Sequence, residues 1–286
     1  MPIHTQDYRH WEGTLKPRNH IQWWVIAKAE LKLLAQRKIV RLIVAIPPVI
    51  YILSYGIFIY IFNILPDVPT GLDIDRGFFQ GFLFRIETFS SAFLVALVVI
   101  FGGAGLIAND LKHKALSLYL SKPISWVDYL IGKFIVIGTL LICMTLIPGL
   151  LLFLEHVLLT DTPFLKENYW LPLSIIAYSV IITTITSLLI LLFSSLTTNS
   201  RYATIGFCAV WFGLPVLHLI LKEILSTSTV ALVSIWANFD RLGNALFGLE
   251  SSYNMHWSWT LLLLAALTAV CILVLRHRIR AVEIVK

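Results

Sequence analysis

The chain contains six apolar segments that are each long enough to cross a lipid bilayer. They cover approximately residues 42–62, 82–108, 129–154, 171–196, 203–221 and 257–275. The hydrocarbon core of a bilayer is about 30 Å thick, and a helix needs about 20 predominantly apolar residues to cross it. The sequence therefore predicts an all-α membrane protein with six transmembrane helices.

The composition excludes a water-soluble globule. Of the 286 residues, 58% are hydrophobic and only 13% are charged, whereas soluble domains have roughly 25% charged residues. The formal net charge of +6 is compatible with nucleic-acid binding, but no nucleic-acid motif accompanies it. In a membrane protein a basic excess normally reflects topology, so we expect membrane lipids, and no nucleic acid, around this chain.

Basic residues gather in alternate connections between the apolar segments. They occur in the N-terminal region, in the second connection, in the fourth, and at the C-terminus, and include Arg37, Lys38, Arg41, Lys112, Lys114, Lys122, Arg201, Arg276, Arg278, Arg280 and Lys286. The positive-inside rule then predicts a multi-pass membrane protein with both termini cytoplasmic. The first twenty residues contain no apolar core of a signal peptide, so the first span is expected to act as an uncleaved anchor.

Three parts of the chain are expected. Residues 1–41 form a cytoplasmic N-terminus, in which residues 19–41 have the spacing of an amphipathic helix; Trp23 and Trp24 suit the headgroup level. An ordinary cytoplasmic tail is the alternative. Residues 42–275 form a single six-helix domain, with Pro47 and Pro48 expected to kink its first helix. Residues 276–286 form a basic cytoplasmic tail.

The connection between the second and third spans carries its own helical signals. Asn109 and Asp110 stand where an N-cap belongs, and the following leucines predict a short amphipathic helix that ends at Lys122-Pro123. Ser125 and Asp128 have the spacing of a capping box that starts the next helix. The pattern predicts a membrane helix, a short surface helix, a proline corner and a newly capped membrane helix.

This order of residues resembles the membrane subunits (permeases) of ABC transporters of the ABC-2 type. The resemblance rests on Gly105, Asn109-Asp110, the run Leu116 to Ser121, Pro123-Ile124-Ser125, and Tyr129 to Lys133. It covers about thirty residues. Many relatives have an acidic-arginine pair before the short helix and Gly-Thr-Leu within it, where this chain has Asp110-Leu111-Lys112 and Lys114-Ala115-Leu116.

The resemblance implies that this short helix is a cytoplasmic coupling helix that docks on a separate ABC ATPase (nucleotide-binding) subunit. The residues expected at that contact are Asp110, Lys112, Leu116, Leu120, Ser121 and Pro123. It also implies a dimer with a second copy or a related permease, and ATP with Mg on the partner subunit. A plain, well-capped cytoplasmic loop is the alternative.

Catalytic and metal-binding patterns are not evident in the sequence. Gly132-Lys133 lacks the upstream glycine of a phosphate-binding loop, and the histidines have no metal-ligand spacing. We therefore expect no enzyme activity, metal or cofactor in this chain. Two other functions stay open: a non-transporting membrane subunit of an ABC-type assembly or signalling complex, and a membrane-embedded lipid-modifying enzyme, which would need a polar cluster at one interface.

Small and polar residues mark two faces of the predicted spans. Ser179, Thr183, Thr186 and Ser187 form a stripe on the fourth span, which packs against neighbouring helices or lines a substrate cavity. Gly102 and Gly103 indicate a close helix contact on the second. The segment 222–256 contains an apolar piece too short to cross the bilayer, which predicts a short outer helical hairpin before the sixth span; a surface loop is the alternative.

Overall fold

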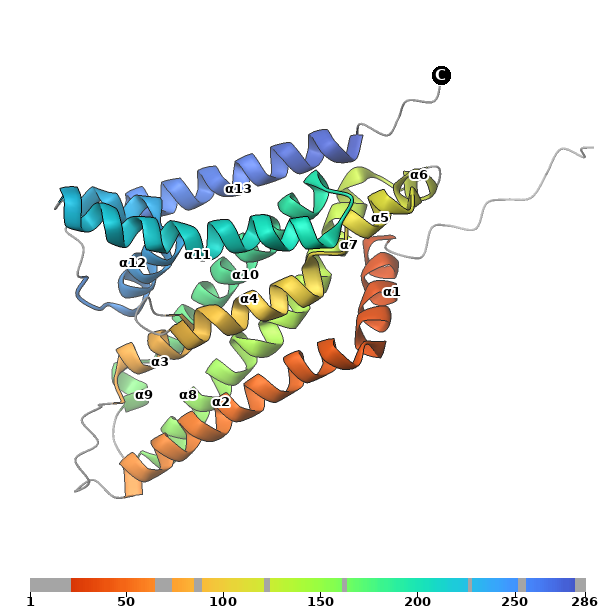
Figure 1. The fold of residues 1–286 in the computed structure, drawn as a ribbon. Coiled ribbons are helices and arrows are strands. Elements are labelled where there is room, and N and C mark those ends of the chain that lie inside the picture. The colour runs from red at the N-terminus through yellow and green to blue at the C-terminus, as the bar shows by residue number, and fades with distance from the viewer. Residues whose placement is uncertain are drawn as a thin grey trace, which may run out of the picture.

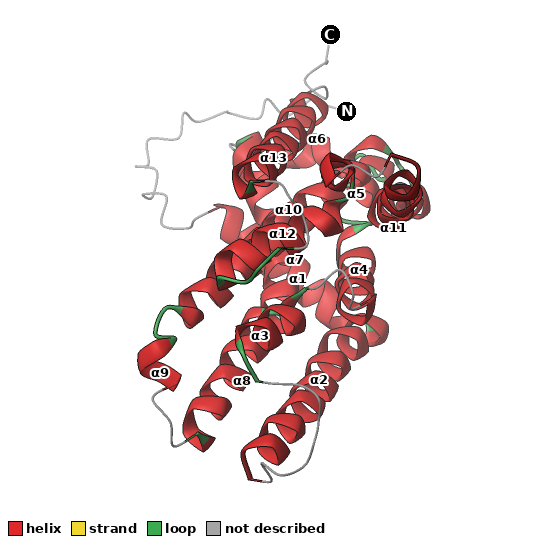
Figure 2. Ribbon diagram, turned by 90° about the vertical axis from the view of Figure 1, so that its left-hand side faces the viewer, coloured by secondary structure: helices red, strands yellow, loops and turns green. Residues whose placement is uncertain are grey.

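The computed structural model describes residues 22–64, 74–84, 89–120, 124–160, 164–225, 228–251 and 256–280. These residues form helices joined by turns and loops, and none of them forms a strand (Figure 2). Six stretches of helix are long and apolar enough to cross a membrane. They overlap all six predicted spans, so the described residues confirm the prediction of an all-helical chain with six helices that are able to cross a membrane.

The six long elements run back and forth between the two ends of one bundle (Figure 1). They are α2 (Lys38–Ile64), α4 (Phe89–Gly103) with α5 (Ala108–Lys112), α7 (Trp126–Met144) with α8 (Leu146–Leu159), α10 (Leu171–Leu196), α11 (Ser200–Leu225) and α13 (Trp257–Arg280). Pro47 and Pro48 lie inside α2 and do not end it. α10 is a central helix that packs against α4, α7, α11 and α13, while α2, α11 and α13 expose most of their surface.

The second span begins later than predicted because residues 76–83 form a separate helix. α3 (Arg76–Leu83) starts at Asp75, whose carboxylate accepts the Phe78 N–H at 3.0 Å. It ends at Phe84, which is extended and fully buried. The Phe84 ring packs edge-on against Trp211, Trp236 and Phe239. The end of α3 is therefore buried against aromatic residues of α11 and α12.

The third span, which was predicted to be one continuous helix, is interrupted. α7 ends at Met144 and α8 begins at Leu146, with Thr145 between them. Pro148 has no N–H to donate to the carbonyl four residues earlier, and its ring crowds that carbonyl. The break therefore lies where a continuous helix would lose a hydrogen bond.

Short helices lie at both ends of the bundle (Figure 1). α1 (Gln22–Gln36) crosses one end of the bundle, and α5, α6 (Ala115–Leu120) and the C-terminal end of α13 lie at this same end. At the other end lie α3, α9 (Phe164–Glu167), the 3₁₀ helix η1 (Ser228–Val233) and α12 (Ile235–Phe247). Two short helices thus occupy the predicted position before the sixth span. Gly248 follows α12 as its C-cap, and its φ of +65° favours glycine.

A buried lysine joins the candidate coupling segment to two helices

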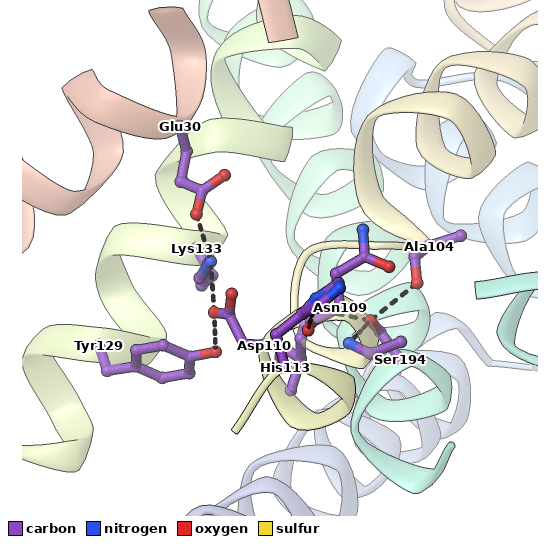
Figure 3. A network of polar contacts seen from close by, with 10 residues as sticks. Glu30, Ala104, Asn109, Asp110, His113, Tyr129, Lys133 and Ser194 are labelled. Carbon is purple, nitrogen blue, oxygen red and sulfur yellow. Dashed lines mark hydrogen bonds and ion pairs between the residues drawn. The ribbon is translucent and has the colours of Figure 1, made fainter. Parts of the chain in front are cut away.

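The start of α7 is set by the predicted capping box, which the structure confirms. Ser125 Oγ accepts the Asp128 N–H at 3.1 Å, and Asp128 Oδ2 accepts the Ser125 N–H at 3.2 Å. Tyr129 and Lys133 follow this cap and are four residues apart, so they lie on the same face of α7. That face points toward α1 and α5 (Figure 3).

Lys133 is the centre of a polar junction between three helices (Figure 3). Its side chain is fully buried, and its Nζ lies 2.5 Å from Glu30 Oε1 of α1 and 2.7 Å from Asp110 Oδ2 of α5. Tyr129 donates its hydroxyl to the same Asp110 oxygen at 2.7 Å. We call Glu30, Asp110, Tyr129 and Lys133 the lysine junction. It links residues that are up to 103 positions apart in the sequence.

Two aromatic rings cover the lysine. The Lys133 Nζ lies 5.9 Å from the ring centroid of Tyr119 on α6 and 5.4 Å from that of Tyr129, within the range of cation–π attraction. Burial raises the pKa of the Tyr119 phenol above its usual value, although the Lys133 ammonium acts in the opposite direction. At neutral pH this phenol is therefore protonated and adds no charge beside Lys133.

The close approach of α1 to α7 requires a glycine. A Cβ at Gly132 would lie 3.0 Å from both Ile26 Cβ and the Trp23 carbonyl oxygen. The second contact is to backbone, which cannot move aside as a flexible side chain can. Gly132 therefore allows α1 to lie against α7 and brings Glu30 within reach of Lys133.

The second span is interrupted between α4 and α5. Ser194 of α10 forms hydrogen bonds with the backbone at this interruption. Its hydroxyl oxygen accepts the N–H groups of Ile107 at 3.0 Å and Ala108 at 2.9 Å. The same hydroxyl donates to the Ala104 carbonyl at 2.9 Å. One buried side chain thus satisfies three backbone groups that the interruption leaves free.

The predicted close contact at Gly103 is confirmed, since a Cβ there would lie 2.9 Å from Ile190 of α10.

The predicted short helix differs from the observed one in two respects. Asn109 and Asp110 are not at its N-cap: α5 begins at Ala108, and Ile107 stands before it. The expected single helix is divided into α5 and α6, because Lys114 has a left-handed backbone with φ of 54°. Asn109 and Asp110 were predicted to cap this helix, but Ser194 of α10 accepts the backbone N–H groups at its start.

The predicted coupling residues are distributed over different environments. Asp110 is mostly enclosed in the lysine junction, and Leu116 is only 2% exposed. Lys112 lies on the surface, beside His113 and Lys114. Leu120 ends α6, but its side chain is not described; Ser121 and Pro123 lie outside the described residues. Among the predicted coupling residues whose side chains are described, only Lys112 is exposed on the surface.

The polar stripe on α10 is buried as a whole. Ser179, Thr183, Thr186 and Ser187 are each at most 4% exposed. Thr186 donates to the Ile182 carbonyl of its own helix at 2.6 Å. The other three hydroxyls have no hydrogen-bond partner among the described residues. Because all four side chains are buried inside the bundle, this stripe is a packing face in the structure.

Glu30 and Lys133 were not among the predicted site residues. Lys133 belongs to the Tyr129 to Lys133 motif of the resemblance, but no role was predicted for its side chain. A charged residue two turns inside an apolar span is a signal in itself, because its burial is costly without a partner. Glu30 has no comparable signal, since it is one of several charges on an amphipathic helix.

The described residues contain no group of three or more His, Cys, Asp or Glu side chains that could hold a metal ion. A scan against protein-family models matches none of them, and a search of curated proteins also returns no match. The function is therefore inferred from the residues and from the geometry of the lysine junction.

Proposed function

We propose that this chain is the permease subunit of an ATP-driven ABC transporter of the ABC-2 type. The observation that carries the proposal is the lysine junction. It ties α5, in the segment that resembles a coupling helix, to α1 and to the first turns of the third span. A force applied to α5 and α6 is transmitted through buried ionic contacts to two helices at once. Motion at a docking site can therefore tilt the bundle.

The docking surface on this chain is the basic turn Lys112-His113-Lys114 between α5 and α6. All three side chains are exposed, and the left-handed Lys114 makes the chain turn there. Lys38, Arg41 and Arg201 are also exposed, and they belong to the starts of α2 and α11, at the end of the bundle that carries α5. The positive-inside rule makes this end cytoplasmic, where an ABC ATPase is accessible.

The proposed assembly contains two permease chains and two ATPase subunits in a plasma membrane. ATP and Mg belong to the ATPase subunits, and closure of these subunits moves the α5–α6 segment. The transported substrate is hydrophobic or amphipathic, and the direction is export, as the resemblance to the family implies. Sparse charge inside the spans also favours such a cargo over a small inorganic ion.

The test is purification of the tagged chain from native membranes in mild detergent, with mass spectrometry of co-purified proteins and an ATP-hydrolysis assay in nanodiscs. The double variant Lys112→Glu with Lys114→Glu reverses the charge of the proposed docking turn. We expect it to reduce the co-purified ATPase at least fivefold, because association depends on complementary surface charge. Both side chains are exposed, so the fold should be retained.

The matched control is Lys166→Glu with Lys222→Glu, which reverses two exposed lysines at the opposite end of the bundle. It should leave the ATPase yield and the hydrolysis rate unchanged. Purification without any ATPase, or equal loss in both double variants, would contradict the proposed function.

A further inference from the structure

A cavity of about 180 Å³ lies between α1 and the junction of α4 with α5. Glu30 and Asp110 of the lysine junction line it, together with Arg37 and Asn109. Leu33 and Phe101 line it as well, and they are 56% and 42% exposed. The cavity thus combines charged groups with apolar side chains that face the surroundings. It lies at the end of the bundle where α1 crosses, the proposed headgroup level (Figure 1).

The two carboxylates of the cavity share a single lysine. Each uses one oxygen for Lys133, namely Glu30 Oε1 and Asp110 Oδ2. Glu30 Oε2 and Asp110 Oδ1 accept no hydrogen bond from any described residue, and the Arg37 guanidinium forms no ion pair with one. The lining of the cavity therefore includes unused carboxylate oxygens of Glu30 and Asp110 and an unused guanidinium of Arg37.

The charges of these groups decide which ligand fits. Glu30 and Asp110 together with Lys133 and Arg37 sum to zero. A net anion or a net cation would leave an uncompensated charge in a partly enclosed site, which is costly. A neutral ligand that carries a separate ammonium and phosphate matches both sets of groups. Arginine binds phosphate with two parallel hydrogen bonds, and basic pockets between membrane helices hold lipid headgroups.

We propose that this cavity binds the headgroup of a phosphatidylethanolamine lipid. The primary ammonium donates hydrogen bonds to Glu30 and Asp110, and Arg37 holds the phosphate. The acyl chains pass along Leu33 and Phe101 into the bilayer. The bound lipid forms a second bridge between α1 and α5, beside Lys133, and so stabilises the lysine junction. This site is independent of the proposed transport role.

The headgroup chemistry gives the test. The delipidated full chain in detergent is titrated with short-chain phosphatidylethanolamine, phosphatidylcholine and phosphatidylglycerol, and its thermal unfolding is followed together with bound lipid by native mass spectrometry. A ligand that binds only the folded state raises the melting temperature progressively as its concentration rises above its dissociation constant. We expect phosphatidylethanolamine to bind at least tenfold more tightly than the other two. Phosphatidylcholine has no N–H to donate, and phosphatidylglycerol has no cation.

Two variants locate the site. Arg37→Gln removes the phosphate partner, and Leu33→Trp fills the cavity without changing its charge; each should weaken binding at least tenfold. Lys28→Gln and Val25→Trp are the matched controls, since both residues are exposed on α1 and neither lines the cavity. They should bind as the unmodified chain does.

Equal stabilisation by all three lipids would overturn the proposal, as would unchanged binding in Arg37→Gln and Leu33→Trp. Equal losses in the two control variants would also overturn it, because that result would indicate a general lipid annulus. Glycerophosphoethanolamine carries the same headgroup without acyl chains. If it raised the melting temperature as much as the lipid does at the same concentration, that result would contradict a lipid ligand and identify a soluble headgroup compound instead.

Discussion

Replacement of Lys133 by methionine tests whether the lysine junction is an ion-pair network that holds α1 and α5 to α7. Methionine keeps most of the side-chain volume but removes the charge, so Glu30 and Asp110 are left facing each other. Removing one partner of a buried ion pair costs about 3–5 kcal/mol. The Glu30 and Asp110 side chains keep 17% and 15% exposure, so water solvates them in part. We therefore expect a loss of about 3 kcal/mol in the free energy of unfolding.

The same reasoning predicts strong non-additivity. The double variant Glu30→Gln with Asp110→Asn leaves the buried lysine unpaired and should also lose about 3 kcal/mol. The triple variant carries no charge in the junction, and replacement of a whole buried ion pair by neutral groups is often close to neutral. It should lose only about 1 kcal/mol, whereas independent effects would add to about 6 kcal/mol.

The assay is reversible unfolding in mixed micelles with increasing dodecyl sulfate, followed by far-UV circular dichroism. Hydrogen exchange of residues 22–36 should also become faster in Lys133→Met, because α1 loses its ionic contact. Lys32→Met removes an exposed lysine of α1 and should change the free energy by less than about 0.5 kcal/mol. Additive losses in the triple variant, or a loss below 1 kcal/mol in Lys133→Met, would refute the reasoning.

Three further changes test the supports of this region. Gly132→Ala should destabilise the protein by about 1–3 kcal/mol in the same assay, because its Cβ meets α1 backbone. Gly213→Ala has open space around the new Cβ and should be neutral or stabilising by up to about 1 kcal/mol. Ser194→Ala should lose about 2–3 kcal/mol and accelerate hydrogen exchange at residues 104–108, since it leaves buried backbone groups unpaired; Ser195→Ala, whose hydroxyl bonds its own helix, should leave that exchange unchanged. The pKa of the Tyr119 phenol is raised in the folded state. Its contribution to the free energy of unfolding is therefore complete below about pH 10 and is lost as the pH rises through the folded pKa. Tyr119→Phe should make the alkaline fall in stability less steep, and an identical pH profile would contradict this.

The sequence by itself determined the features that depend on local chemistry. The six spans follow from uninterrupted apolar length, and α10 has the predicted bounds of residues 171–196. The capping box at Ser125 and Asp128 was predictable because both partners lie within one turn. The helix in residues 22–36 was predictable from its apolar spacing. In each case the residues that make the structure are neighbours in the chain.

Tertiary structure decided where those helices are interrupted and which polar groups meet. The division between α4 and α5 depends on Ser194, which lies 86 residues beyond Ala108. The pairing of Lys133 with Glu30 spans 103 residues, and it requires the absence of a side chain at Gly132. A pattern within one segment predicts which face of a helix is apolar, but it does not say which other helix covers that face. For this reason Asp110 and Leu116 were expected on a docking surface, whereas Asp110 is held in the lysine junction and Leu116 is buried in the hydrophobic core.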